Sequence, residues 1–200
     1  MFNRLVLPKM LPPAEREAHR LIRFAGTYNC RDMGGYSTCD GRQVRWGVLY
    51  RSDALHRLTG RDRALFGALE LATLIDLRSD DEQARQPNRL PANHRIRVVS
   101  IPILDADQGQ SAHLRERIMR GDVAGIDAPA LLTEGYRQFV TGSTPQFRRF
   151  MAALLAAEGK PVLFHCRAGK DRTGFAAAIT LRLLGAPPEA IAADYRLSGG

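Results

Sequence analysis

Short apolar runs alternate with segments of helical character along most of the chain. Five runs that are rich in β-branched, aromatic or other apolar residues predict strands, at residues 21–24, 48–50, 73–77, 96–101 and 161–165. Strands that alternate with helices, without an internal repeat, are typical of an α/β layer fold. The pattern therefore predicts a central, mostly parallel sheet that is flanked by helices.

Helix signals follow most of these strands. Ser, Thr or Pro before an amphipathic or apolar stretch starts a helix, and Gly after such a stretch ends one. On these signals the sequence predicts helices over residues 60–69 (capped by Thr59), 80–85 (capped by Ser79), 146–157 (opened by Thr144 and Pro145, ended by Gly159), 172–184 (ended by Gly185), and a last helix that starts at 187–189.

Two stretches fall outside this alternation. Residues 1–20 hold a short apolar patch broken by prolines, and we expect a mobile N-terminal arm there, before a single domain of residues 21–200. Residues 105–130, with a short amphipathic piece, form an insertion of roughly 25 residues, which exceeds ordinary loop lengths. Such insertions are often lids or binding loops, and a solvated surface excursion is the alternative that the sequence leaves open.

Composition supports one globular domain, because the chain has 200 residues and 44% of them are hydrophobic. No apolar stretch approaches the ~20 residues that cross a bilayer, and the N-terminus lacks the apolar region of a secretory signal. The 3 cysteines, Cys30, Cys39 and Cys166, are too few for a disulfide scaffold. We therefore expect a reducing compartment and a cytoplasmic protein, or one exported without a recognisable signal peptide.

Basic residues outnumber acidic ones by 29 to 21, which gives a formal net charge of +8. They are scattered as single residues and pairs, without a run of five and without interleaved aromatic residues. Because a nucleic-acid groove needs a basic stripe and stacking platforms, the sequence does not predict a nucleic-acid partner. A diffuse positive field instead favours small acidic substrates.

The strongest chemical signal is the segment Val-Leu-Phe-His-Cys-Arg-Ala-Gly-Lys-Asp-Arg-Thr-Gly at residues 162–174. Cys166 follows a predicted buried strand, and Arg172 begins a predicted helix after a loop of five residues. A short loop over a helix N-terminus directs its backbone N–H groups at one point, and that concavity binds a tetrahedral oxyanion. The loop amides, the helix terminus and Arg172 all favour the thiolate of Cys166, so the segment predicts a nucleophile that faces phosphate.

Two further residues suit this chemistry. Arg172 can bind two phosphoryl oxygens at once, which a lysine cannot do with the same geometry. Gly169 permits a backbone turn that a Cβ atom would obstruct. The alternative is an inert, buried cysteine at a strand end, but burial alone does not explain the Gly, Lys, Asp and Arg residues that follow.

The segment resembles the Cys, five residues, Arg, Ser/Thr loop of the protein tyrosine phosphatase superfamily. Its Gly-Lys-Asp-Arg-Thr-Gly form is similar to that of the bacterial tyrosine/lipid phosphatases, which act on phosphoproteins and phosphoinositides. Further segments of this chain resemble other elements of that branch. They are residues 29–36 (Asn-Cys-Arg-Asp-Met-Gly-Gly-Tyr), 47–52, 75–79 (Ile-Asp-Leu-Arg-Ser) with Glu82, and 194–198. The resemblance spans residues 21–198.

This resemblance implies hydrolysis of phosphate monoesters through a cysteinyl-phosphate intermediate, without a metal or another cofactor. Cys166 is the implied nucleophile, Arg172 the phosphate clamp, and Thr173 a hydroxyl donor to the sulfur as it leaves. His165 would orient the loop, and its other phosphate-binding residues would be Arg167, Ala168, Gly169 and Lys170. Candidates for bracing the loop are Asp76, Arg78, Arg31 and Asp32, and the alternative for each is a local turn or a surface pair.

The general acid that protonates the leaving oxygen has two candidates. Asp171 lies inside the loop, as it does in this branch of the family. Asp105 follows a predicted strand, on the segment that supplies a mobile aspartate in many related phosphatases. We favour Asp171, because the Lys170-Asp171-Arg172 sequence is intact, whereas no fixed geometry is visible around Asp105.

The expected substrates are phosphotyrosine proteins first and acidic phosphorylated lipids such as phosphoinositides next, with phosphoserine and phosphothreonine as further candidates. Two other functions use a similar loop. A rhodanese-like sulfurtransferase also places a cysteine in an anion-binding loop, and a thiosulfate-to-cyanide assay separates it from a phosphatase. A catalytically inactive phosphate-binding module is disfavoured by the intact Cys166 and Arg172, and phosphate release from an aryl phosphate decides that question.

Overall fold

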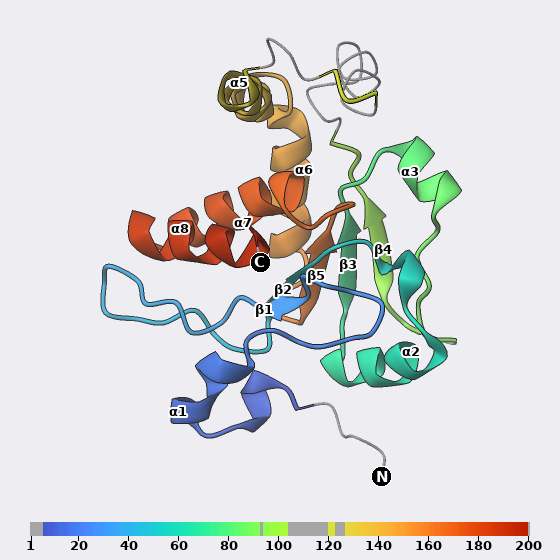
Figure 1. Cartoon of the computed structure of the whole chain (residues 1–200). Helices are drawn as coiled ribbons and strands as arrows, with labels where there is room; N and C mark the ends of the chain where they lie inside the picture. The colour runs from blue at the N-terminus through green and yellow to red at the C-terminus, as the bar shows by residue number, and fades with distance from the viewer. Residues whose placement is uncertain (1–5, 93, 104–119, 123–126, 200) are drawn as a thin grey trace.

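A mixed five-stranded sheet occupies the centre of the structure, a computed structural model that describes residues 6–92, 94–103, 120–122 and 127–199. The strand order is β1-β2-β5-β3-β4, with β1 antiparallel to β2 and all other neighbours parallel (Figure 1). The strands are β1 (Arg31–Asp32), β2 (Leu49–Ser52), β3 (Thr73–Asp76), β4 (Arg97–Ser100) and β5 (Val162–His165). The predicted α/β fold with a mostly parallel sheet is confirmed.

Strands β2 to β5 form where the apolar runs predicted them, within two residues at each end. The strand predicted at residues 21–24 is wrong, because this segment makes only an isolated bridge between Leu21 and Arg31. Its apolar character has another cause. Ile22 and Phe24 are 2% and 5% exposed in the core that packs against one face of the sheet, so burial alone selects them.

Helices and short 3-10 turns connect the strands. They are η1 (Pro8–Met10), α1 (Pro13–Arg16), η2 (Glu17–His19), η3 (Leu55–Arg57), α2 (Gly60–Phe66), η4 (Gly67–Leu69), α3 (Asp80–Arg85), α5 (Ala128–Thr141), α6 (Thr144–Leu155), α7 (Asp171–Leu183), α8 (Pro188–Arg196) and η5 (Leu197–Gly199). Thr59 and Ser79 start α2 and α3 through capping boxes, as predicted. Across the described parts of the chain, none of these helices is both long and apolar enough to cross a membrane.

Two apolar cores lie on opposite faces of the sheet, because successive residues of a strand point to opposite sides. Ile75 and Phe164 belong to the core that is covered by α5, α6 and α7. Leu74 and Leu163 belong to the other core, which holds α2, η4 and the segment before β1. The central strands β3 and β5 are buried along their whole length, which explains why apolar residues occupy successive positions at Leu74-Ile75 and at Val162-Leu163-Phe164.

Helix α5, with 14 residues, is the longest element that the sequence pattern missed. Its first residues, 128–130, fall within the insertion expected at residues 105–130, and the remainder of that insertion lies outside the described residues apart from residues 120–122. Most of the expected lid therefore lies outside the described residues, and the lid stays a prediction. The contacts that anchor α5 are aromatic: Phe139 packs against Phe147 of α6 and Phe175 of α7, at centroid distances of 6.2 Å and 5.6 Å.

In its described residues, 6–20, the N-terminal segment differs from the mobile arm expected for residues 1–20. From Leu7 onward it packs against the domain, and Leu7 itself is fully buried in the core beside α2. Arg20 is 4% exposed and stacks over the rings of Tyr36 and Trp46 at 4.1 Å and 4.7 Å. Burial of an apolar anchor and a stacked arginine outweighs the prolines that suggested a free arm.

Candidate active site

Cys166 lies directly after β5, at the carboxyl end of a central parallel strand, and is 2% exposed. Residues 167–170 form the loop, with Lys170 as the N-cap of α7, so the helix begins at Asp171 and not at Arg172. The strand, the loop and the helix N-terminus therefore meet at the sulfur, as the sequence predicts. A helix N-terminus favours negative charge at this point.

The carbonyl groups of three consecutive loop residues are held from outside the loop. The Arg167 carbonyl accepts a hydrogen bond from the Ala54 amide at 3.0 Å. Asn29 donates through Nδ2 to the carbonyls of Ala168 and Gly169, at 3.3 Å and 3.0 Å. Because a trans peptide points its C=O and N–H in opposite directions, the amides of residues 168–170 face the inner side of the loop. This arrangement is suited to an oxyanion.

Gly169 sits where the loop touches the end of β2. Its φ is +68°, and a Cβ atom built there would lie 2.6 Å from the Ser52 carbonyl oxygen and 2.7 Å from the Asp53 amide nitrogen. Both the left-handed backbone and the close approach exclude a side chain, in agreement with the turn expected at this glycine.

Arg172 projects from the first turn of α7 and is fixed by a carboxylate that sequence reasoning did not assign to the site. Its Nη1 and Nη2 donate to the two carboxylate oxygens of Glu82, at 2.6 Å and 3.0 Å. Burial would raise the pKa of Glu82, but the hydrogen bond and charge of Arg172 outweigh it and lower the pKa. Glu82 therefore stays ionised and orients the guanidinium.

Glu82 also belongs to the capping box of α3, where it accepts a hydrogen bond from the Ser79 amide at 2.9 Å. The Ser79-x-x-Glu82 spacing was a visible signal of that cap. Nothing local in the sequence indicates that the same carboxylate reaches Arg172, which is 90 residues away along the chain.

A buried ionic network supports the loop from α8. Asp194 forms ion pairs with Arg31 and Arg51, and all three side chains are at most 2% exposed. Arg51 also donates to the Gly169 carbonyl at 2.7 Å, and Arg31 donates to the Asn29 side chain. Burial would raise the pKa of Asp194, but the charges of Arg51 and Arg31 outweigh it and hold the pKa below its usual value.

Replacing Asp194 with asparagine should therefore destabilise the protein strongly, because two buried guanidinium groups lose their counter-charge. We expect the free energy of unfolding to fall by about 3–5 kcal/mol. The matched control is Asp81→Asn, which removes the exposed ion pair with Arg85, whose side chains are about four-fifths exposed, and should change stability by less than about 1 kcal/mol. Denaturant titrations of both variants test this, and equal losses would contradict it.

Asp76 and Arg78, which we expect to brace the loop, pair with each other at the end of β3. Arg78 pairs with Asp76 at 2.7 Å, and both side chains are 1% exposed. His165 Nε2 lies 3.6 Å from the Asp76 carboxylate, while Nδ1 lies 3.1 Å from the Cys166 carbonyl oxygen. Burial lowers the pKa of His165 more than Asp76 raises it, so the ring is neutral and its single N–H can donate to that carbonyl.

Asp32, another bracing candidate, does not contact the loop. Its carboxylate accepts hydrogen bonds from the amides of Gly34 and Gly47, each at 2.8 Å, so the local-turn alternative describes it. The reason is its register: neighbouring residues of β1 point to opposite sides, and Arg31 takes the side that faces Asp194.

The remaining candidates occupy three environments. The side chains of Arg167, Ala168 and Lys170 are exposed around the loop. Thr173 is fully buried, and within the described chain its hydroxyl has no hydrogen-bond partner. Asp105 lies outside the described residues. Among those that are described, no three His, Cys, Asp or Glu side chains are grouped so that they could hold a metal ion.

A cysteine at the end of a central parallel strand, a loop with inward amides and an oriented arginine are together the features expected of a cysteine-dependent phosphatase. The model of the tyrosine phosphatase family matches residues 22–199. The chain therefore belongs to the tyrosine phosphatase family, which confirms the family and the class of enzyme expected from its sequence.

Named relatives agree with this family. The chain is 34% identical over 190 residues to a tyrosine-protein phosphatase of Cupriavidus necator, covering 95% of this chain and 67% of that protein. It is 34% identical over 186 residues to the triple specificity protein phosphatase PtpB of Mycobacterium tuberculosis, covering 85% of this chain and 66% of PtpB. The chain thus spans about two thirds of the length of these relatives.

A solved structure that matches the chain resembles it only distantly. TpbA of P. aeruginosa, in complex with phosphotyrosine, is 21% identical, with a TM-score of 0.42 over 75% of this chain and 68% of TpbA.

Proposed function

We propose that the protein hydrolyses phosphate monoesters through a covalent phosphate on Cys166. The observation that carries this proposal is the loop itself, whose carbonyls are held outward by Ala54, Asn29 and Arg51. The inward amides are preorganised for the equatorial oxygens of a phosphoryl group in transfer, so they need no rearrangement when charge develops there. Arg172, held by Glu82, adds a two-pronged donor to the same oxygens.

The first chemical step forms one bond and breaks another. The thiolate sulfur of Cys166 attacks phosphorus in line with the leaving oxygen, an S–P bond forms, and the P–O bond to the leaving group breaks. Asp171 gives its proton to the departing oxygen, so the alcohol or phenol leaves neutral.

Water completes the cycle. A water molecule gives a proton to Asp171 and attacks phosphorus, while the S–P bond breaks and inorganic phosphate is released. The buried Thr173 hydroxyl, which has no partner within the described chain, is available to donate to the sulfur as its negative charge returns. His165 supports the loop through the Cys166 carbonyl.

Phosphotyrosine in proteins is the first proposed substrate, and phosphoinositides are the second. The exposed side chains of Arg167 and Lys170 add positive charge beside the phosphate loop, which suits a substrate with a second phosphate or an acidic flank. PtpB is named as a triple specificity phosphatase, and a breadth of this kind, including phosphoserine and phosphothreonine, is proposed here as well.

A phosphate-release assay on a phosphotyrosine peptide, a phosphoserine peptide and phosphoinositides tests this proposal. We expect the phosphotyrosine peptide to give the highest kcat/KM among the peptides. Transfer of sulfur from thiosulfate to cyanide, without phosphate release from an aryl phosphate, would instead indicate the sulfurtransferase. Binding of phosphate without release from any substrate would indicate an inactive binding module.

The assignment of the general acid has its own prediction. Asp171→Asn should flatten the basic limb of the pH–rate profile and should affect aryl esters with good leaving groups least, because these need no proton to depart. Asp105→Asn is the matched comparison and should leave both features unchanged. The opposite pattern, with the leaving-group dependence altered only in Asp105→Asn, would transfer the role to Asp105.

A further inference from the structure

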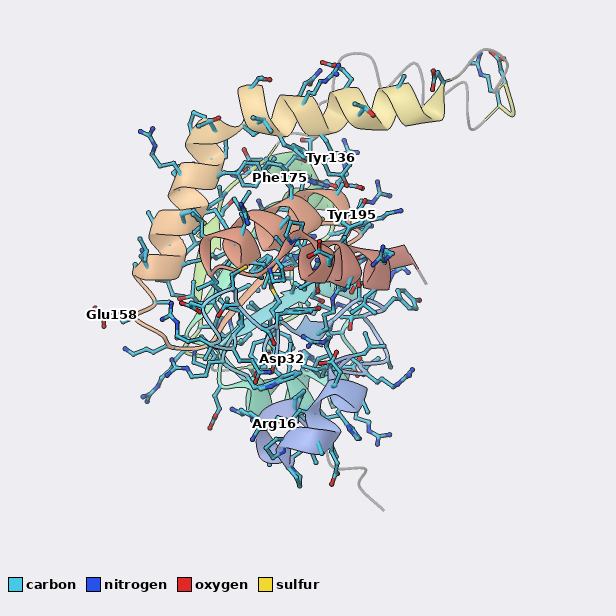
Figure 2. All side chains as sticks on the ribbon, turned by 90° about the vertical axis from the view of Figure 1, so that its left-hand side faces the viewer. Arg16, Asp32, Tyr136, Glu158, Phe175 and Tyr195 are labelled. Atoms are coloured by element: carbon cyan, nitrogen blue, oxygen red, sulfur yellow. The ribbon has the colours of Figure 1, made fainter. Side chains whose placement is uncertain are left out.

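Two tyrosine hydroxyls from distant elements meet at the carboxylate of Asp171. Tyr136 of α5 donates a hydrogen bond to Asp171 Oδ1 at 2.8 Å. The Tyr195 hydroxyl of α8 lies 2.7 Å from that of Tyr136 and 3.4 Å from the same carboxylate oxygen. Figure 2 shows Tyr136 beneath α5, with Tyr195 below it on α8. Three helices therefore converge on one oxygen of the proposed general acid.

The number of protons that each group can donate fixes the direction of these hydrogen bonds. A carboxylate oxygen only accepts, so the single proton of Tyr136 points to Asp171, and the proton between the two tyrosines belongs to Tyr195. Burial raises the pKa of Tyr136, and its hydrogen bonds to Tyr195 and Asp171 raise it further. The phenol therefore keeps its proton at neutral pH, and each bond in this series polarises the next.

The two carboxylate oxygens of Asp171 have different surroundings. Within the described chain, Tyr136 donates to Oδ1, the Tyr195 hydroxyl lies near the same oxygen, and no hydrogen bond reaches Oδ2. A protonated carboxyl group can accept at one oxygen while it donates from the other. Because Tyr136 donates to Oδ1, Oδ2 is the oxygen left to carry the proton of the acid.

Packing holds the two rings in place. Gly174, one turn into α7, lets the Tyr195 ring approach so closely that a Cβ atom there would lie 3.0 Å from it. The rings of Tyr136 and Tyr195 meet edge to face at a centroid distance of 6.4 Å, and Tyr136 meets Phe139 in the same way at 5.6 Å. The hydroxyls therefore have little freedom to rotate away from Asp171.

We propose that Tyr136 and Tyr195 are positioning residues for Asp171, and that they fix which carboxyl oxygen delivers the proton to the leaving group. This inference rests on the proposed phosphatase function and on Asp171 as its acid. As the proton leaves Oδ2, the carboxylate gains charge, and the hydrogen bond from Tyr136 becomes charge-assisted and roughly twice as strong. The pair thus stabilises the transition state more than the ground state.

The decisive experiment compares Tyr136→Phe on two substrates with different leaving groups. On phosphotyrosine, whose leaving oxygen needs a proton, we expect kcat/KM to fall about tenfold or more, since a hydrogen bond to a charged group is lost. On an aryl phosphate with a strongly electron-withdrawing leaving group, we expect a fall of less than about threefold. Tyr195→Phe should also lower kcat/KM more on phosphotyrosine than on the aryl phosphate, but by a smaller factor, because Tyr136 still donates to Asp171.

Two controls separate positioning from packing. Tyr50→Phe removes another buried tyrosine hydroxyl, which has no hydrogen-bond partner in the described chain, and should leave both substrates unaffected. The double variant Tyr136→Phe/Asp171→Asn should be no more selective between leaving groups than Asp171→Asn alone, because the acid that Tyr136 serves is already absent. Orthovanadate affinity and the free energy of unfolding report on damage to the loop or fold.

Each result has one meaning. Equal losses of Tyr136→Phe on the two substrates would reduce the pair to a packing contact and overturn the inference, as would no loss on either. An active wild type whose Asp171→Asn variant keeps its leaving-group dependence also overturns it and leaves the phosphatase function standing. A wild type without phosphatase activity overturns both.

Discussion

Cys166→Ser should abolish phosphate release while the protein still binds phosphate-like oxyanions. We expect kcat to fall by a factor on the order of 10⁵ or more, because a serine hydroxyl stays protonated where the thiol supplies a thiolate nucleophile. Binding survives because the loop amides and Arg172 are unchanged. The Ala54, Asn29 and Arg51 contacts that shape the loop do not involve the sulfur.

The measurement pairs steady-state hydrolysis of phosphotyrosine with the dissociation constant of orthovanadate or tungstate. Cys30→Ser is the matched control, because Cys30 is equally buried and burial raises its pKa to about 12, so that it is no thiolate at neutral pH. That variant should keep its turnover. Activity of Cys166→Ser within tenfold of the wild type would remove this residue from the chemistry.

Arg172→Lys has the second-largest expected effect, a loss of about 10³ or more in kcat/KM. A lysine places a point charge where the guanidinium forms two parallel hydrogen bonds with phosphoryl oxygens. It also loses the two-pronged contact with Glu82, so the replacement cation is no longer oriented toward the loop. The positive charge alone does not restore either geometry.

Arg85→Lys is the control for this substitution, because Arg85 is four-fifths exposed and pairs with Asp81 at the surface. It should leave kcat/KM unchanged. A near-normal rate for Arg172→Lys on phosphotyrosine would show that the guanidinium fork is dispensable, and the clamp would then have to be sought elsewhere around the loop.

The parts of the site that the sequence predicted are contiguous in the chain. Cys166, Gly169 and Arg172 lie within one strand–loop–helix unit, where a buried run, a glycine and a helix start fix local geometry. The helix caps at Ser79 and Thr59 could also be predicted from the sequence, because a helix cap depends on residues three positions away. Local spacing is sufficient to place such groups.

The parts that were missed depend on tertiary contacts. Glu82 was visible as a capping residue, but its contact with Arg172 arises only when the first turns of α3 and α7 come together. The same holds for Arg51 and Asp194, whose role follows from burial beneath the loop. The strand predicted at residues 21–24 is wrong for the converse reason, because apolar residues in a packed loop show the same pattern as a strand.

The position of Asp194 has a consequence for how the site matures during synthesis. Arg31 and Asp194 are separated by 163 residues, and the Gly169 carbonyl depends on an arginine that Asp194 neutralises. Contacts between such distant residues close late in folding, because the intervening chain must first be ordered. A nascent chain that has emerged only through α7 therefore possesses its cysteine and arginine but not the ionic support of the loop. The loop around the reactive thiol therefore gains its ionic support only after α8 docks.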